Sequence, residues 1–207
     1  MISLFIDTSL VNVSISVIKD NKILSLIQKE IPNMHSSYVT KFIKDALDEA
    51  KIDANDIDDL LVVTGPGSFT GVRIGVTIAK TYGYLIKKDI IPISSLKSLA
   101  ISANYKDNVM SIIPANKSSY YVGIYDSNYN EIINERFMKK EEIILLCNKY
   151  NPYIVGNDTS IIGKYKINKQ NLDILKIVEY YKDKEKVNYF KLVPNYLKEP
   201  QALEDKQ

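Results

Sequence analysis

Two short stretches near the start of the chain combine residue types that could hold a phosphate or a metal ion. In IDTS, at residues 6–9, an aspartate at the expected end of a strand precedes two hydroxyls. GPGSFTG, at residues 65–71, lies directly between an apolar run and a helical pattern. Glycines let a backbone approach an anion, and the free N–H groups of a helix start point into such a loop. Together the stretches predict a phosphate cradle, although each alone is also ordinary turn chemistry.

The glycine loop does not match the two common phosphate motifs. It lacks the Gly-Lys-Ser/Thr ending of the P-loop, and its third glycine, Gly71, stands one residue too late for the dinucleotide fingerprint. Arg73, one of two arginines in the chain, follows closely and has the forked, permanently charged donor that suits a carboxylate or a phosphate. A structural ion pair that fixes the loop is the alternative role for Arg73.

The helix expected after the loop carries small residues on one face. Gly71, Gly75, Ala79 and Gly83 recur every four residues and would leave a shallow groove along the helix. A glycine inside a helix costs roughly 1 kcal/mol relative to alanine, so several together need a packing reason. Either the helix lies tight against its own sheet, or it forms part of a subunit interface. The residues alone leave both alternatives open.

The composition of the 207 residues indicates a globular protein with no charged tail. Basic and acidic residues number 27 and 25 and are spread along the chain, so direct, strong binding of nucleic acid is not indicated. No apolar run approaches the roughly 18 residues of a membrane span, and the chain starts directly on a strand. We therefore expect a cytoplasmic protein with no membrane contact. Cys147 is the single cysteine, so no disulfide can form within these residues.

The pattern of apolar residues predicts the same α/β unit twice. In the first half, strands are expected at 2–7, 12–18, 23–28 and 60–64, with a helix near 38–50. In the second half, strands are expected at 109–114, 120–125, 131–137 and 153–155, with a helix at about 139–150. A helical stretch after Ser94 would link the halves, and a further amphipathic helix is expected near 174–181. We predict an α/β fold of two duplicated lobes, 1–103 and 104–207, with the last residues packing back on the first lobe.

The glycine loop and the IDTS stretch together resemble the TsaB (YeaZ) family, bacterial relatives of the actin-like ATPase superfamily. GPGSFTGVRIG at 65–75 is the specific part, and PNYLK at 194–198 is similar to the family's Pro-x-Tyr-Leu-Arg ending. The resemblance extends over essentially the whole chain. It implies two actin-like (ribonuclease H-like) lobes, each a mixed sheet with helices. It also implies a role in forming threonylcarbamoyladenosine at position 37 of tRNAs that read codons beginning with adenine.

The resemblance implies that the chain works as a partner of TsaD, the paralogue that transfers the threonylcarbamoyl group to tRNA. A heterodimer with TsaD, a ternary complex with the ATPase TsaE, a homodimer of the lone chain and only indirect contact with tRNA are implied. In the family the first two helices, here residues 36–51 and 68–87, form the dimer surface. The implied interface residues are Tyr38, Phe42, Ala46, Gly71, Arg73, Gly75, Ala79 and Tyr82. This match favours the interface alternative for the small-residue face.

The resemblance also implies where a nucleotide would lie and why catalysis is not expected. No cofactor is tightly bound in the family, but ATP or ADP with Mg can lie at the junction with TsaD. The tentative nucleotide contacts here are Asp7, Thr8, Ser9, Gly65, Pro66, Gly67 and Ser68. Two metal-binding histidines of TsaD correspond to Ser95 and Leu99, and His35, the single histidine, cannot build such a site alone. We therefore assign no catalytic or metal-binding residue.

Two other functions are alternatives to a non-catalytic partner. Asp7, Thr8 and the glycine loop would suit an actin-like ATPase or a transferase acting by itself, although no general base is evident in the second half. A metallopeptidase would have to be built around His35. The second lobe also departs from the family in one hairpin, where an acid, an arginine and an acid are replaced by Pro114, Asn116 and Ser119.

Overall fold

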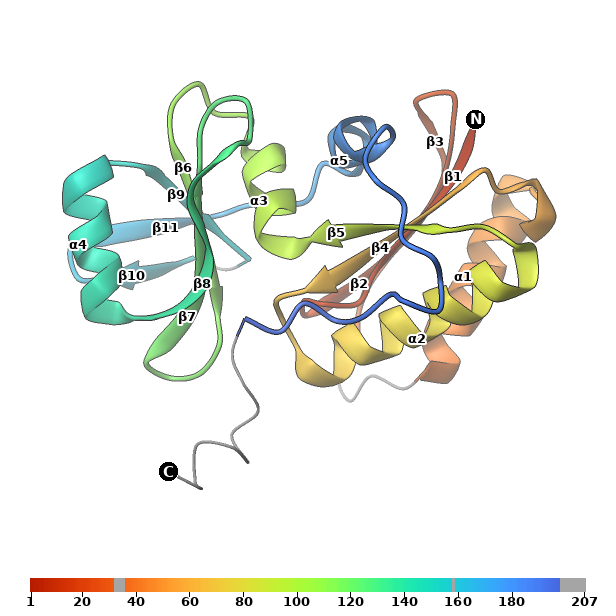
Figure 1. Cartoon of the computed structure of the whole chain (residues 1–207), viewed down its shortest axis with the longest axis horizontal. Helices are drawn as coiled ribbons and strands as arrows, with labels where there is room; N and C mark the ends of the chain where they lie inside the picture. Colours follow the sequence, from red (N-terminus) through yellow and green to blue (C-terminus); the bar gives the residue numbers. More distant parts are fainter. Residues whose placement is uncertain (32–35, 158, 198–207) are drawn as a thin grey trace. The chain divides into compact units, whose positions relative to one another are not determined.

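The computed structural model describes residues 1–31, 36–157 and 159–197, which fold into two compact units (Figure 1). The first unit combines Met1–Ser95 with Leu172–Pro194, and the second combines Leu96–Asn171 with the chain from Asn195 onward. The sequence places one boundary after residue 103, whereas the chain in the structure crosses between the units three times. Residues 96–103 therefore belong with the second unit, and residues 172–194 return to the first.

The first unit is a five-stranded mixed sheet with helices on both faces (Figure 1). Its strands are β1 (Ile2–Asp7), β2 (Asn12–Lys19), β3 (Lys22–Glu30), β4 (Asp59–Gly65) and β5 (Ile90–Ser94). Its helices are α1 (Ser36–Ala50), the short 3-10 helix η1 (Ala54–Asp56), α2 (Phe69–Ile86) and α5 (Ile174–Tyr181). The order β3-β2-β1-β4-β5 is antiparallel as far as β1 and parallel from β1 through β4 to β5.

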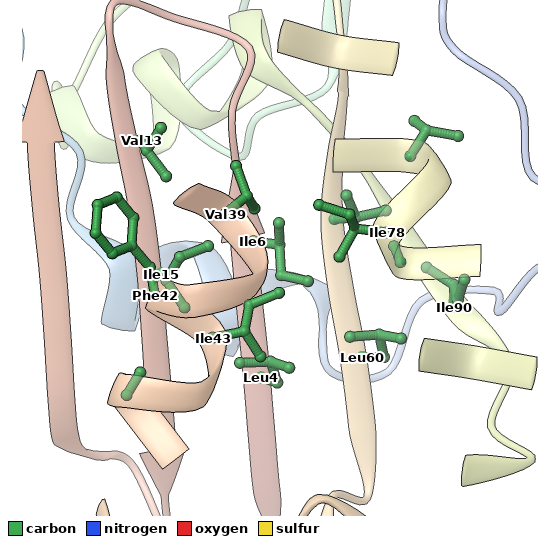
Figure 2. Close-up of a cluster of buried hydrophobic side chains, with 14 of the residues drawn as sticks. Leu4, Ile6, Val13, Ile15, Val39, Phe42, Ile43, Leu60, Ile78 and Ile90 are labelled. Carbon is green, nitrogen blue, oxygen red and sulfur yellow. The ribbon is translucent and has the colours of Figure 1, made fainter. Parts of the chain in front are cut away.

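A cluster of buried apolar side chains holds α1 and α2 on one face of this sheet (Figure 2). Leu4 and Ile6 of β1 belong to it together with Ile43 of α1 and Ile78 of α2. β4 is buried along its whole length, as expected for a parallel strand with both faces covered. Burying each large apolar side chain contributes roughly 1.5–3 kcal/mol, so this cluster determines which sides of the two helices face the sheet.

The second unit is a six-stranded mixed sheet that begins after helix α3 (Ser95–Ala103). Its strands are β6 (Val109–Pro114), β7 (Ser119–Tyr125), β8 (Glu131–Lys139), β9 (Tyr153–Gly156), β10 (Ser160–Ile162) and β11 (Tyr165–Lys169). Helix α4 (Lys140–Tyr150) covers one face, with Ile143 and Cys147 in the buried core. The order is β10-β11-β9-β6-β7-β8, and β6 pairs antiparallel with β7 and parallel with β9.

The predicted α/β fold with two mixed sheets is confirmed, and each strand and helix predicted within the described residues is present. Three strands were not predicted, namely β5, β10 and β11. Pro92 lies inside β5 and removes a backbone donor, which argues against a strand in sequence but is tolerated at the edge of a sheet. Among the described residues, no helix is long and apolar enough to cross a membrane.

Candidate functional site

The two stretches expected to form a phosphate site lie directly against each other. They follow the neighbouring parallel strands β1 and β4. Both turns therefore begin at the carboxyl ends of these strands, at the same end of the sheet. The backbone N–H of Ser68 donates to the carbonyl oxygen of Ser9 at 2.7 Å. The hydroxyl of Thr8 donates to the carbonyl oxygen of Gly71 at 2.7 Å. The turn after β1 is therefore fastened to the glycine loop and to the first turn of α2.

This contact explains the loop glycine Gly67 and two glycines of α2, Gly71 and Gly75. A Cβ atom at Gly67 would overlap the carbonyl oxygen of Ser9, and one at Gly71 would overlap the carbonyl oxygen of Thr8. A Cβ at Gly75 would overlap the hydroxyl oxygen of Thr8. The near atoms belong to a turn that hydrogen bonds hold in place, so they cannot move away cheaply. The small-residue face of α2 therefore packs within the chain, at Gly71 and Gly75 against the turn after β1 and at Gly83 against Lys88 and Tyr189. Packing within the chain is the first of the two alternatives that the sequence left open.

Asp7 is buried at the centre of this arrangement and has an altered pKa. One oxygen of its carboxylate accepts hydrogen bonds from the backbone N–H of Ser9 at 2.8 Å and from the hydroxyl of Ser9 at 2.7 Å. Burial raises the pKa of Asp7 above its ordinary value of 3.8, while the two hydrogen bonds from Ser9 act in the opposite direction. The folded chain therefore binds a proton at Asp7 more tightly than the unfolded chain does.

The remaining polar groups of the loop also bond within the chain. The hydroxyl of Ser68 caps α2 by accepting the N–H of Gly71 at 3.2 Å. The hydroxyl of Ser95, at the start of α3, donates to the carbonyl oxygen of Pro66. Gly65 has a φ of 107°, in the region that favours glycine. The seven residues predicted to contact a nucleotide thus lie in two adjoining turns, and several of their polar groups are hydrogen-bonded to one another or to Gly71 and Ser95.

The two positions that the family resemblance matches to histidines of TsaD are buried. Ser95 and Leu99 are 1% and 0% exposed, respectively. Within the residues that the structure describes, no group of three or more His, Cys, Asp or Glu side chains is arranged to hold a metal ion. His35 lies outside the described residues. Chemically, the described part of this region can fasten α2 to the sheet.

Most of the residues expected at an interface lie inside the first unit. The buried ones are Phe42, Ala46, Gly71, Gly75 and Ala79. Tyr38 and Arg73 are exposed, and Tyr82 is half-buried. A partner could therefore reach α1 and α2 only through their outward side, and substitutions at the buried positions would test folding rather than contact.

The outward side of α2 carries apolar residues that the sequence reasoning did not assign. Phe69 is 54% exposed in the first turn, and the guanidinium carbon of Arg73 lies 3.7 Å from the centre of its ring. Tyr84 and Leu85 are exposed near the end of the helix. Phe69, Arg73 and Thr77 follow one another at helical spacing on the side away from the glycines. That complementary spacing is the signal that could have identified this side from the sequence.

The altered hairpin of the second unit forms a self-contained turn. The N–H groups of Ala115 and Asn116 both donate to the carbonyl oxygen of Ser119, at 2.9 and 3.2 Å. The side-chain oxygen of Asn116 accepts the N–H of Ser118 at 3.0 Å. The replacements in this hairpin thus support a tight turn.

Comparison with known proteins places the chain in a family. A family model described as TsaD, tRNA N6-adenosine threonylcarbamoyltransferase, matches residues 28–199. The chain is 30% identical over 169 residues to the tRNA threonylcarbamoyladenosine biosynthesis protein TsaB of Bacillus subtilis, a match that covers 78% of this chain and 73% of the relative. It is 33% identical over 146 residues to the protein of the same name from Buchnera aphidicola subsp. Baizongia pistaciae, covering 68% of this chain and 63% of that relative.

A solved structure shows the same fold. It belongs to an uncharacterized protein with similarity to peptidase YEAZ from Pseudomonas aeruginosa, and it superposes with a TM-score of 0.81. The match covers 95% of this chain and 99% of the other at 21% identity, which bears on the fold alone. The extent of the family match and the identity to the Bacillus protein carry the assignment. The chain belongs to the TsaB (YeaZ) family of tRNA threonylcarbamoyladenosine biosynthesis proteins.

Proposed function

We propose that this chain is a non-catalytic, cytoplasmic partner subunit of TsaD in formation of the threonylcarbamoyl group on adenosine 37 of tRNAs that read codons beginning with adenine. Family membership is the observation that carries this proposal. The geometry near the glycine loop supports a non-catalytic role, because the polar groups of Thr8, Ser9 and Ser68 are engaged within the chain. On this proposal TsaE joins the pair, and tRNA is bound mainly by the other subunits.

The partner contact is proposed on the outward side of α1 and α2, which we call the helix surface and define by Tyr38, Phe69 and Arg73. Its composition fits a specific interface, because exposed aromatic side chains and arginine are the residue types most enriched at interface centres. The stacked pair of Phe69 and Arg73 presents both an apolar ring and a permanent charge. In the absence of TsaD, the same surface would be open to a second copy of the chain.

Reconstitution of the modification tests the proposal. Purified TsaD, TsaE, the threonylcarbamoyl-adenylate synthase and unmodified tRNA are mixed with threonine, bicarbonate and ATP, with and without this chain. We expect threonylcarbamoyladenosine to form only when the chain and TsaD are both present, and no product from the chain without TsaD. Omission of the chain with no loss of product would contradict the partner role.

An ATP hydrolysis assay on the same purified chain distinguishes the partner role from the alternative of an active ATPase or transferase. That alternative predicts metal-dependent ATP hydrolysis by the lone chain, abolished by Asp7→Ala in a variant that is still folded. The proposal predicts that hydrolysis by the lone chain does not exceed background. Titration calorimetry with ATP or ADP and Mg, run on the chain alone and on its mixture with TsaD, tests the tentative nucleotide contacts at the loop.

A further inference from the structure

The end of α2 and the segment that follows α5 together present a group of aromatic rings, which we call the aromatic cluster and define by Tyr84, Tyr189 and Phe190. The ring centres of Tyr189 and Phe190 are 4.7 Å apart, and that of Tyr84 lies 6.0 Å from Phe190 and 6.1 Å from Tyr189. Phe190 is 67% exposed, Tyr84 is 49% exposed, and Leu85 is exposed beside them. Single exposed apolar side chains are ordinary, whereas a contiguous group of them marks a binding surface.

The backbone holds the ring of Phe190 in its exposed position. The N–H of Phe190 donates to the side-chain oxygen of Asn188 at 3.1 Å, and its carbonyl oxygen accepts the ammonium group of Lys80 at 3.1 Å. The side-chain amide of Asn188 donates in turn to the carboxylate of Asp89 at 3.2 Å, so this acid is already engaged. Tyr189 is half-buried and packs against the core. A side chain that is fixed in advance loses little conformational entropy on binding.

Lysines without acidic partners surround the aromatic cluster. The ammonium group of Lys87 lies 4.0 Å from the centre of the Tyr84 ring. Lys88 follows Lys87, and Lys191 follows Phe190. None of these three lysines forms an ion pair with a carboxylate of the described residues. Positive charges beside exposed rings favour a ligand that has both anionic groups and flat faces.

We propose that the aromatic cluster and its three lysines bind a short single-stranded segment of RNA. An unstacked base would lie on the open face of Phe190, and the ammonium groups of Lys87, Lys88 and Lys191 would bind the adjoining phosphates. Sites that bind single strands without sequence preference combine these two features, aromatic rings for stacking and cations for the backbone. An acidic peptide would satisfy the lysines but would leave the rings without bases to stack on.

This inference goes beyond the proposed function, in which tRNA is bound mainly by the other subunits. The near balance of basic and acidic residues over the whole chain argues against strong binding of nucleic acid, whereas a small local site gives weak binding. The aromatic cluster is also separate from the helix surface, because Tyr84 comes about 22 Å after Phe69 along the axis of α2. RNA could therefore bind here while the helix surface contacts TsaD.

Fluorescence anisotropy of a labelled oligouridylate of about ten nucleotides, titrated with the lone full chain at several salt concentrations, tests the proposal. The variants are Phe190→Leu, Lys87→Gln and Lys191→Gln. Phe190→Leu keeps an apolar side chain and removes the ring, so it separates base stacking from a general apolar contact. Labelled polyglutamate is the second probe, because it carries the charges without the bases. The assay contains no TsaD, so its failure would leave the proposed partner role intact.

Two matched controls come from the second unit. Tyr105→Leu removes another exposed ring, which is stacked on Tyr153 with ring centres 4.4 Å apart. Lys149→Gln removes another ammonium group that lies over a ring, 5.0 Å from the centre of Tyr150. Circular dichroism and melting temperature establish that each variant is folded.

We expect the wild-type chain to bind the oligonucleotide with a dissociation constant between about 10⁻⁶ and 10⁻⁴ M. Phe190→Leu should bind about tenfold more weakly. Each lysine substitution should weaken binding and lower the slope of log affinity against log salt by about 0.7, as for one lost phosphate contact in a single strand. Both controls should bind as the wild type does.

Three results would overturn the proposal. The first is no binding of the oligonucleotide at chain concentrations up to about 10⁻³ M in low salt, well above the expected range. The second is binding that Phe190→Leu retains in full, because stacking on the ring would then contribute nothing. The third is binding of polyglutamate as tight as that of the oligonucleotide, which would assign the surface to an acidic segment of a protein instead.

Discussion

At the scale of single residues, hydrogen-bond partners decide what the glycine loop does. The sequence could predict that IDTS and GPGSFTG would meet, because both follow strands of one predicted lobe. It could not predict that the Ser9 carbonyl would take the N–H of Ser68, because that bond depends on packing between residues 59 positions apart. The chemistry that looks available in the sequence is therefore engaged internally in the folded chain.

Asp7→Asn should stabilise the chain at neutral pH. Because burial raises the pKa of Asp7 in the folded state, the contribution of this group to stability is fully present below 3.8 and is lost as the pH rises through the folded pKa. Asparagine keeps an oxygen that can accept both hydrogen bonds from Ser9 without placing a charge in the core. Urea unfolding at several pH values should show a gain over wild type at pH 7 that shrinks as the pH approaches 3.8.

Asp126→Asn serves as the control, because the pKa of Asp126 is shifted in the direction opposite to that of Asp7. Hydrogen bonds from Asn130 and Asn128 lower the pKa of the Asp126 carboxylate, so its contribution is present above 3.8 and is lost as the pH falls through the folded pKa. Asp126→Asn should therefore be less stable than the wild-type chain at pH 7. A loss of stability in Asp7→Asn that is equal at pH 7 and pH 4 would contradict the account of Asp7.

Gly71→Ala should destabilise the chain, although alanine is normally the better helix former by roughly 1 kcal/mol. The added methyl group would overlap the backbone oxygen of Thr8, which hydrogen bonds hold in place. We expect the free energy of unfolding to fall by roughly 1–3 kcal/mol, as for other overpacked sites. Thr77→Ala, at an exposed position of the same helix, should change it by less than about 0.5 kcal/mol. Equal stability of both variants in urea unfolding would rule out the tight contact.

At the scale of elements, residues 186–192, which follow α5, pack across α2 and β5, and we call this segment the strap. Lys80 of α2 donates from its ammonium group to the carbonyl oxygens of Phe190 and Leu192, both at 3.1 Å. Lys186 pairs with the buried carboxylate of Asp59 at 2.5 Å. The strap thereby covers an edge of the sheet and adds Leu192 to the core.

Lys80→Met should loosen this strap while keeping most of the apolar stem of the side chain. Two charge-assisted hydrogen bonds in a partly exposed setting lead us to expect a loss of roughly 1–2 kcal/mol. Hydrogen exchange at the amide of Val187 should become faster as well. Lys41→Met removes only an exposed ion pair with Asp45, so it should cost less than about 0.5 kcal/mol. Unchanged exchange at Val187 in Lys80→Met would show that the strap is held by other contacts.

The strap also marks the limit of what periodicity can predict about elements. Amphipathic stripes identified α1, α4 and α5, because each buries one side against a sheet. Among the described residues, the backbone of the strap pairs with the sheet only at Val187, so the strap leaves no periodic signal in the sequence. The hairpin of β10 and β11 was missed because strands of three and five residues are too short for a pattern to emerge.

At the scale of the whole molecule, the duplication of an α/β unit was predictable, but the division of the chain was not. The order of three antiparallel strands, a helix and a parallel strand occurs in both halves and could be read from hydrophobic patterns. The sequence predicted that the last residues pack back on the first lobe, but the bounds of the returning segment could not be read: residues 172–194 belong to the first unit, and the chain from Asn195 onward belongs to the second. The burial of Phe42 and Ala46 was likewise hidden, since an apolar stripe on a helix fits a core and an interface equally well.

The most direct test of the central claim is the affinity of this chain for its cognate TsaD, measured by titration calorimetry with light scattering to establish the mass. Phe69→Glu is compared with Leu145→Glu, which places the same charge at an exposed apolar residue outside the helix surface. We predict a heterodimer with wild type and with Leu145→Glu, and at least about tenfold weaker binding with Phe69→Glu at an unchanged melting temperature. Absence of binding by the wild-type chain, or equal binding by all three, would contradict the account of this chain as a partner that acts through its first two helices.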